Sequence, residues 1–351
     1  MNCYVRSMLL LLAGALCACT SQHTYEQAET FTWSDLSEPV ALQGDSVVFD
    51  EAPLKPTRVA VVDSFLLIKN QNVERFFYLY DVDTKQKKGE RIPFGSGPEE
   101  MIDPVWMPLP DGDFGVLDRN QQRMDVYPGH SLLVNDSVKP VKRIAFNELL
   151  LNMIALPGVG FISSTIQGED KRFALFNFDG KRVSYFGDYP EAYREGTAYE
   201  KYMEFTADLA AKPDGSRWVV AHRLTDLIEI YDNQLRLVKR IQGPDGFFPE
   251  MEEVGGQMRH SKEERETYSF PFATDDYIYV LYDGRVYDWE SPTRYLRDKL
   301  LVFDWEGNPV AYYQLSDPVF HFTIDVRHGM LYGLSDRPEF HVTVYKLPEI
   351  D

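Results

Sequence analysis

Residues Leu300–Tyr313 read LLVFDWEGNPVAYY and show the structural unit that the rest of the chain repeats. An apolar run ends in Phe303-Asp304, a short turn follows that contains Gly307, and a second apolar run leaves the turn. Apolar runs of this length on both sides of turn residues predict a strand, a tight turn and a second strand.

Weaker copies of this unit occur along the whole chain. Each copy has a short apolar segment, a tight turn with a following strand, and then a strand that ends in an aromatic residue; most copies add a fourth apolar run. The copies recur at intervals of roughly fifty residues, as the four-stranded blades of a β-propeller do. The strands with the terminal aromatic residue are Phe76–Asp81, Arg123–Pro128, Phe173–Asn177, Leu227–Asp232, Leu300–Asp304 and Phe340–Lys346.

The predicted fold is therefore all-β: a six-bladed β-propeller over residues 39–351, with four antiparallel strands in each blade. The last copy ends near Tyr345 without a fourth strand, whereas Pro39–Asp50 precedes the first copy and belongs to no blade. We expect Pro39–Asp50 to add the outer strand of the last blade and to close the ring, because closure removes an exposed sheet edge.

Residues 1–18 have the features of a lipoprotein signal peptide. Arg6 supplies a positive charge, the apolar run that follows is too short to span a bilayer, and residues 16–19 read Leu-Cys-Ala-Cys, which resembles the bacterial lipobox. The last Cys of a lipobox carries the lipid, so Cys19 is the predicted lipidation site and the polar residues 19–38 are predicted to be a lipidated tether. The alternative is an ordinary signal peptide with an incidental Cys.

Composition excludes some classes of function. The net charge of −19 disfavours nucleic acid as a partner, since neutralising phosphates requires clustered Lys and Arg. The three Cys lie within the first 19 residues, which leaves no thiol in the folded domain for a disulfide, a nucleophile or a metal cluster. The chain also lacks the Gly-x-Ser-x-Gly and His-Glu-x-x-His motifs of hydrolases and zinc proteases.

The long insertions are predicted to share one face of the propeller. If strands run from the axis outward in antiparallel order, residues 187–204, 242–267 and 282–297 all connect strands on the same side. Long loops in a compact fold usually have a function, so this loop-rich face is the predicted binding surface. The charged helix formers within 242–267 predict a short surface helix.

Insertion 282–297 has the composition of a ligand-binding loop. It combines Arg285 and Arg294 with Tyr287 and Trp289. Planar aromatic rings stack on sugars or peptides, and Arg forms paired hydrogen bonds with carboxylates. The alternative interpretation is a loop that packs over the mouth of the propeller.

Basic residues recur where the second strand of a blade connects to the third. Arg75, Arg123, Arg172 and Arg223 occupy these connections. A ring of Arg at the top of the channel would concentrate positive potential and attract an anionic ligand. The alternative is that these residues pair with the many Asp and Glu of neighbouring blades.

Three features together resemble a known family, the TolB-like six-bladed β-propeller lipoproteins of Bacteroidota. They are the lipobox, the Gly-x-Gly-Pro-Glu loop at Gly95–Glu99, and the run Leu301–Val310. The family loop often continues with Gly-Glu after the Pro, whereas here Glu99-Glu100 follows. The resemblance covers nearly the whole mature chain and implies an envelope lipoprotein; it implies no reaction and no catalytic residue.

Two functions remain open from the sequence. The first is a binding module, without a cofactor, whose loop-rich face captures an envelope protein, a peptide or a glycan. The second is a metal-dependent hydrolase or lyase of the lactonase type, with Ca²⁺ at the axis held by carboxylates such as Asp103 and Glu204. In both cases we expect a bacterial cell-envelope protein anchored to the outer membrane. The lack of an acidic run after Cys19 favours the periplasmic side.

Overall fold

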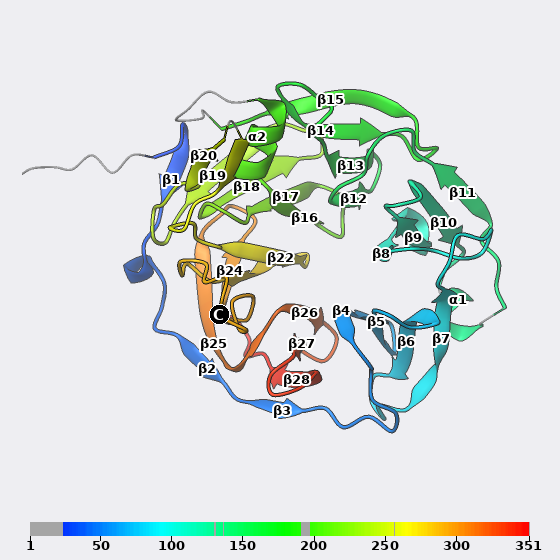
Figure 1. The fold of residues 1–351 in the computed structure, drawn as a ribbon. Helices are drawn as coiled ribbons and strands as arrows, with labels where there is room; N and C mark the ends of the chain where they lie inside the picture. The colour runs from blue at the N-terminus through cyan, green and yellow to red at the C-terminus, as the bar shows by residue number, and fades with distance from the viewer. Residues whose placement is uncertain (1–23, 130, 136, 191–196, 256, 351) are drawn as a thin grey trace, which may run out of the picture.

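In the computed structural model, six mainly antiparallel sheets form a ring (Figure 1). The structure describes residues 24–129, 131–135, 137–190, 197–255 and 257–350. Within each sheet, consecutive strands pair in sequence order from the axis outward, as expected for propeller blades. The predicted six-bladed β-propeller is therefore confirmed.

The first three blades contain four strands each. Blade 1 has β4 (Pro56–Val62), β5 (Phe65–Asn70), β6 (Arg75–Asp81) and β7 (Lys87–Pro93). Blade 2 has β8 (Pro104–Pro108), β9 (Phe114–Asp118), β10 (Arg123–Tyr127) and β11 (Lys142–Ala145). Blade 3 has β12 (Met153–Leu156), β13 (Gly160–Ser164), β14 (Lys171–Phe176) and β15 (Arg182–Asp188).

The last three blades each include a strand from the N-terminal segment. Blade 4 has β16 (Ala207–Ala211), β17 (Arg217–His222), β18 (Leu227–Asp232), β19 (Leu237–Gln242) and β1 (Ala28–Thr30). Blade 5 has β22 (Tyr268–Ala273), β23 (Tyr277–Tyr282), β24 (Arg297–Asp304), β25 (Pro309–Val319) and β2 (Val40–Leu42). Blade 6 has β26 (His321–Asp325), β27 (Met330–Ser335), β28 (His341–Lys346) and β3 (Gly44–Ser46).

The ring is closed as the sequence predicts, by β3 pairing antiparallel with β28. Gly44 lies opposite Tyr345 in this pair, and a Cβ added at Gly44 would lie 2.5 Å from the ring of Tyr345. The absent side chain at Gly44 therefore allows the closing strand to approach the fully buried Tyr345. The parallel pairing of β2 with blade 5 was not predicted.

The segment 24–50, called the strap below, follows the outer edge of blades 4, 5 and 6 (Figure 1). This placement corrects the prediction that residues up to 38 form a tether. Tyr25, Phe31 and Leu36 are buried, and β1 extends blade 4 by parallel pairing with β19. The apolar side chains are spaced among polar ones, which explains why composition alone indicated a solvated segment.

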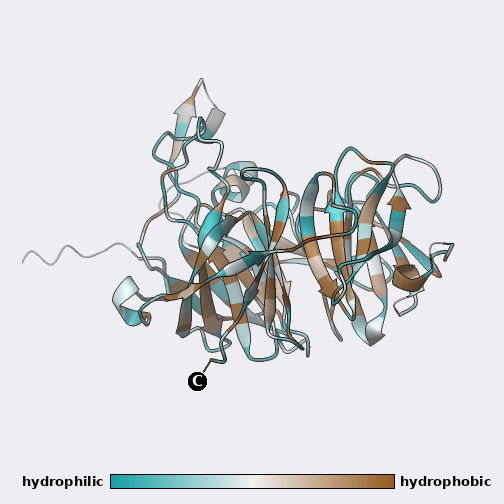
Figure 2. Cartoon of the chain, turned by 90° about the horizontal axis from the view of Figure 1, so that it is seen from below, coloured by the Kyte–Doolittle hydropathy of each residue, from teal (hydrophilic) through white to brown (hydrophobic). Residues whose placement is uncertain are grey.

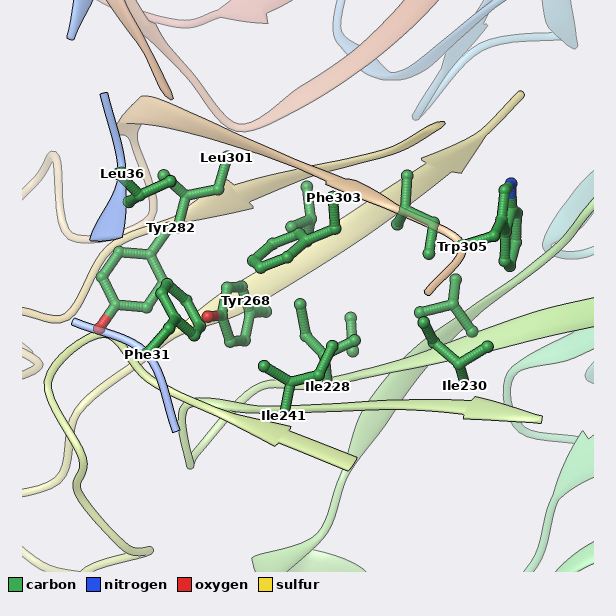
Figure 3. Packing of buried hydrophobic residues seen from close by; sticks show 14 residues of the cluster. Phe31, Leu36, Ile228, Ile230, Ile241, Tyr268, Tyr282, Leu301, Phe303 and Trp305 are labelled. Atoms are coloured by element: carbon green, nitrogen blue, oxygen red, sulfur yellow. The ribbon is translucent and has the colours of Figure 1, made fainter. Parts of the chain in front are cut away.

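The strap contributes to the core between blades 4 and 5 (Figure 3). Phe31 packs edge-on against Phe303 with ring centroids 5.5 Å apart, and Leu36 joins the same cluster. Aromatic pairs in this geometry add to the free energy gained from apolar burial. The other labelled members of the cluster are Ile228, Ile230, Ile241, Tyr268, Tyr282, Leu301 and Trp305.

The loop-rich face carries the insertions, and the C-terminus lies at the opposite face of the ring (Figure 2). Insertion 187–204 ends in α2 (Ala198–Glu204), which begins with a capping box formed by Thr197 and Glu200. A second helix, α1 (Ser131–Val134), was not predicted. The helix predicted from the charged run at residues 260–268 is wrong, because residues 261–267 form turns and irregular structure. Just before this run, β20 (Met251–Val254) and β21 (Gln257–His260) form a hairpin. No helix in the described parts of the chain is long and apolar enough to cross a membrane.

Candidate functional site

An axial channel is bounded by the innermost strand of each blade. Near the loop-rich face it contains a cavity of about 240 Å³. Strands β4, β8, β12, β16, β22 and β26 all contribute lining residues. Each of these strands begins at the loop-rich face. Polar residues at the beginning of a strand, or just before it, therefore gather around the mouth of the channel.

Four cationic side chains lie at this mouth. Arg58 comes from the start of β4, Lys69 from the end of β5, and Arg119 and Arg223 follow β9 and β17 directly. Arg58 and Arg119 line the cavity, and Lys69 lines the adjoining recess between blades 1 and 2. We call these four residues and the carboxylates that pair with them the axial cluster.

The carboxylates of the axial cluster are Asp103 and Asp208. Asp103 accepts hydrogen bonds from Lys69 and from Nη2 of Arg119, the latter at 2.9 Å. Asp208 forms a bidentate ion pair with Arg223, from Nε to Oδ2 at 3.0 Å and from Nη2 to Oδ1 at 2.9 Å. The next carboxylate near Arg223 belongs to Glu266, which is paired with Arg297. The four cations of the axial cluster thus face two carboxylates, which leaves an excess of positive charge.

Arg58 is the cation without a carboxylate partner. Among the described residues, no Asp or Glu oxygen lies within ion-pair distance of its guanidinium, which instead stands 5.4 Å from the ring centroid of Phe270. Burial lowers the pKa of Arg58, and the positive charges of Arg119 and Arg223 act in the same direction despite the opposing charge of Asp208. The guanidinium nevertheless remains a cation near neutral pH, because the reference pKa of Arg is far higher.

His321 lies beside Arg58 at the start of β26. The backbone N–H of Val59 points at its Nδ1, with 3.4 Å between the two nitrogens, and this contact requires Nδ1 to accept. Nη1 of Arg58 lies 3.5 Å from Nε2, and since a guanidinium only donates, this contact requires Nε2 to accept. Burial and the charge of Arg58 hold the pKa of His321 well below its usual value. A neutral imidazole accepts at only one of its nitrogens, so one of the two donors that face His321, the Val59 N–H or the Arg58 guanidinium, has no acceptor on the ring.

The ion pairs keep the other charges of the axial cluster fixed. Burial alone would raise the pKa of Asp208, but Arg223 outweighs this effect and holds the pKa below its usual range. The pKa of Asp103 is lowered in the same way, because Lys69 and Arg119 oppose the effect of burial. Asp103 and Asp208, the carboxylates of the axial cluster, are thus ionised and already paired with cations.

The cluster does not suit a divalent cation. Within the described residues no three His, Cys, Asp or Glu side chains are grouped as metal ligands. Asp103 is engaged by two cations, and Glu204 is buried in α2. The donors expected for the Ca²⁺ site of the lactonase-type alternative are therefore not assembled at the axis.

Of the predicted binding residues, the structure brings Arg223 into the axial cluster. Arg75 is exposed at the start of β6, away from the cavity. Arg123 donates from Nη2 to the carbonyl of Glu100 at 2.7 Å, and its Nε lies 3.6 Å from Oδ1 of Asp125. Cys19, the predicted lipidation site, lies outside the described residues.

Arg172 lies inside the molecule instead of on its loop-rich face. Its side chain is 3% exposed, and Nη1 donates to Oε2 of Glu229 at 2.5 Å. The other oxygen of Glu229 accepts from Nε of Arg240 at 2.9 Å, and Nε2 of His222 lies 3.2 Å from Oε2. Arg172 therefore pairs with an acidic residue of the neighbouring blade, which was one of the two arrangements that the sequence left open.

The residues of insertion 282–297 form a group of their own above blade 5. Arg285 makes two hydrogen bonds to the Asp283 carboxylate. Nε of Arg294 donates to the hydroxyl of Tyr287 at 3.0 Å, and Tyr287 packs edge-on against Trp289. Trp289 remains 58% exposed, and the axial cavity is lined by other residues. The structure thus separates this loop from the Arg ring of the sequence prediction.

Sequence reasoning missed Arg58 and His321 as site residues. Both stand near the start of an innermost strand, a position that Asp208 shares on β16. Aligning the six repeats on the starts of their first strands would have placed these three polar residues in one ring.

Comparisons with known proteins agree with this architecture. The model of the TolB-like 6-blade propeller-like family matches residues 41–327. A protein of Bacteroides fragilis NCTC 9343 described as exported has a similar structure, with a TM-score of 0.61 at 9% identity over 91% of this chain and 99% of its own. A member of the DUF4221 family from Bacteroides vulgatus ATCC 8482 gives a TM-score of 0.56 at 11% identity, covering 88% and 98% of the two chains. At these identities the structures show the fold alone.

A search of curated proteins finds no match. Since the family match spans most of its length, the chain belongs to the TolB-like six-bladed propeller family.

Proposed function

We propose that this protein is a lipid-anchored envelope module that binds a ligand through an anionic group at the axial cluster. The observation that carries the proposal is Arg58, a cation at the channel mouth without a carboxylate partner among the described residues. A partly buried cation without a counter-ion is costly, and a bound anion would offset that cost. Once an anion takes the Arg58 guanidinium, His321 could keep Nδ1 as the acceptor for Val59 and donate a second hydrogen bond to the same anion from Nε2.

The geometry supports an anionic group over a cation or a neutral sugar. The carboxylates of the axial cluster are paired with Lys69, Arg119 and Arg223, whereas Arg58 has no carboxylate partner among the described residues. In a chain with a net charge of −19, this local positive region would also guide an anion towards the axis. The partner we propose is an envelope protein, peptide or glycan that presents a carboxylate or phosphate.

The test uses inorganic phosphate as the probe and the full chain as the receptor. Calorimetric titration at low ionic strength should show binding, and Arg58→Gln should weaken it roughly ten-fold or more, since a charge-assisted hydrogen bond contributes about 1.5–3 kcal/mol. The matched control is Arg75→Gln, which removes an exposed Arg from the same face. Equal losses in the two variants, or no loss with Arg58→Gln, would show that the axial cluster is not the anion site.

The membrane anchor is a second part of the proposal. A leader of the lipobox type and the exported description of a structural neighbour both support an envelope location, for which we propose the periplasmic side of the outer membrane. Metabolic labelling with palmitate should label the wild-type chain but not Cys19→Ala, which should leave the membrane fraction. Cys17→Ala, at the variable lipobox position, is the control and should keep the label. A labelled or membrane-bound Cys19→Ala protein would refute the anchor.

A further inference from the structure

The channel changes character below the axial cluster. Trp106, Met153, Leu209 and Phe272 line the cavity and are only partly buried, although they lie on the innermost strands. Large apolar side chains that stay accessible inside a protein are unusual, because the hydrophobic effect favours closing them off from water. The interior of this channel is therefore a largely apolar surface that no side chain of the described residues covers.

The apolar section continues towards the opposite face. A second cavity of about 460 Å³ lies beyond the first and shares with it the lining residues Ala60, Trp106, Phe272 and Thr323. Thr323 lines both cavities, and its hydroxyl oxygen accepts a hydrogen bond from the backbone N–H of Val61 at 3.3 Å. Together the two cavities approach the size of pockets that hold small molecules.

A donor-rich mouth above an apolar channel is complementary to one chemical class. We infer that the ligand is an amphipathic anion: a carboxylate that meets Arg58 and His321, with an unbranched apolar tail that enters the channel past Trp106 and Phe272. This inference rests on the proposed anion site and replaces the protein, peptide or glycan proposed above with a small amphiphile, an alkyl carboxylate. The tail would displace water from the side chains that line the channel, whereas the head would stay at the mouth.

The first experiment is a titration of the full chain with butyrate, hexanoate and octanoate below their aggregation limits. Affinity should rise by roughly three-fold per added methylene, since each buried methylene contributes a nearly constant increment. Octanol and octyltrimethylammonium test the head group and should bind at least ten-fold more weakly than octanoate. Equal affinities for butyrate and octanoate would overturn the tail inference and leave the anion site standing. Octanol that binds as tightly as octanoate would instead overturn the anion site.

A variant inside the channel separates the two parts further. Ala60→Leu adds apolar volume on β4 at the boundary of the two cavities, two residues from Arg58. Octanoate should then lose at least ten-fold in affinity, while butyrate and phosphate should bind as in the wild type. Retained phosphate binding reports that the variant is folded. Unchanged octanoate affinity in such a protein would show that the tail does not occupy the channel.

Discussion

The indole Nε1–H of Trp33 donates a hydrogen bond to Oδ1 of Asp245 at 2.8 Å, joining residues 212 positions apart in the chain. Oδ2 of the same carboxylate accepts from the hydroxyl of Tyr282 at 2.6 Å. Asp245 therefore links the strap to blade 5 from the connection that leaves blade 4. The strap is held by this polar contact in addition to the burial of Phe31 and Leu36.

The strap should accordingly unfold together with the propeller. Trp33→Ala removes the hydrogen bond to Asp245 and the edge contact with Tyr282 (5.6 Å between ring centroids), and should lower the free energy of unfolding by about 2 kcal/mol. Denaturant unfolding measures this directly. Glu38→Ala, at an exposed strap position, is the control and should change stability by less than about 0.5 kcal/mol. Equal stability of both variants would mean that the strap is not part of the cooperative unit.

Asp226 should make the protein less stable as the pH rises. Its Oδ2 accepts from the N–H groups of Asp245 (2.9 Å) and Gly246 (2.6 Å), whereas Oδ1 is buried without a partner among the described residues. Burial, with a further contribution from the nearby Asp245 carboxylate, raises the pKa of Asp226 to about 7. The unfolded chain loses this proton near pH 4, so between about pH 4 and 7 the folded state binds the extra proton and stability falls with rising pH.

Asp226→Asn tests this sign, because the amide cannot ionise. The variant should exceed the wild type in stability at pH 8 by about 1–3 kcal/mol, and the difference should shrink towards pH 4. Unfolding curves at pH 4, 6 and 8 provide the comparison. Asp276→Asn removes a carboxylate from an exposed turn and serves as the matched control. A difference between Asp226→Asn and wild type that is the same at all three pH values would rule out a protonated Asp226.

Arg172 should matter for stability and not for anion binding. Arg172→Met leaves the fully buried Glu229 with one guanidinium fewer, and breaking a buried ion pair on one side costs about 3–5 kcal/mol. Phosphate affinity should stay at the wild-type level, since the network lies apart from the residues that line the axial cavity. Arg75→Met is the exposed control for stability. A stable Arg172→Met protein with weakened phosphate binding would restore Arg172 to the binding face.

The propeller could be predicted from sequence because its blades repeat. The run at Leu300–Asp304 and its five relatives mark one strand in each blade, and alternating apolar residues next to Gly- or Asp-containing turns define strand pairs locally. Closure by β3 followed from counting strands. The pairing of β1 and β2 did not follow, because three-residue strands carry no periodicity and their partners lie more than two hundred residues away.

The binding site was predicted only in part, for a related reason. Arg residues between the second and third strands of a blade were recognised, yet sequence does not show which of them meet a carboxylate: Arg172 finds Glu229 and Arg223 finds Asp208. Arg58 stands in a strand that reads as ordinary β-structure. Its importance comes from the absence of a carboxylate partner among the described residues, which depends on where all six blades place their acidic side chains.

Asp103 distinguishes the anion site from a metal site. The carboxylate holds Lys69 and Arg119, and Asp103→Asn would remove one negative charge from the axial cluster. Anion affinity should therefore rise by roughly three- to ten-fold, given a gain of about 1 kcal/mol from a charge a few ångströms away in a partly solvated site. Lys69 is only 5% exposed and loses its counter-ion, so stability should fall by about 2–3 kcal/mol.

Asp113→Asn, at the opposite end of the channel, is the control. Titrations of the wild type and of Asp103→Asn with phosphate and with Ca²⁺ distinguish the two kinds of site. Tighter phosphate binding by Asp103→Asn supports the anion site. A wild-type protein that binds Ca²⁺, and loses it with Asp103→Asn, would establish the cation site of the hydrolase alternative.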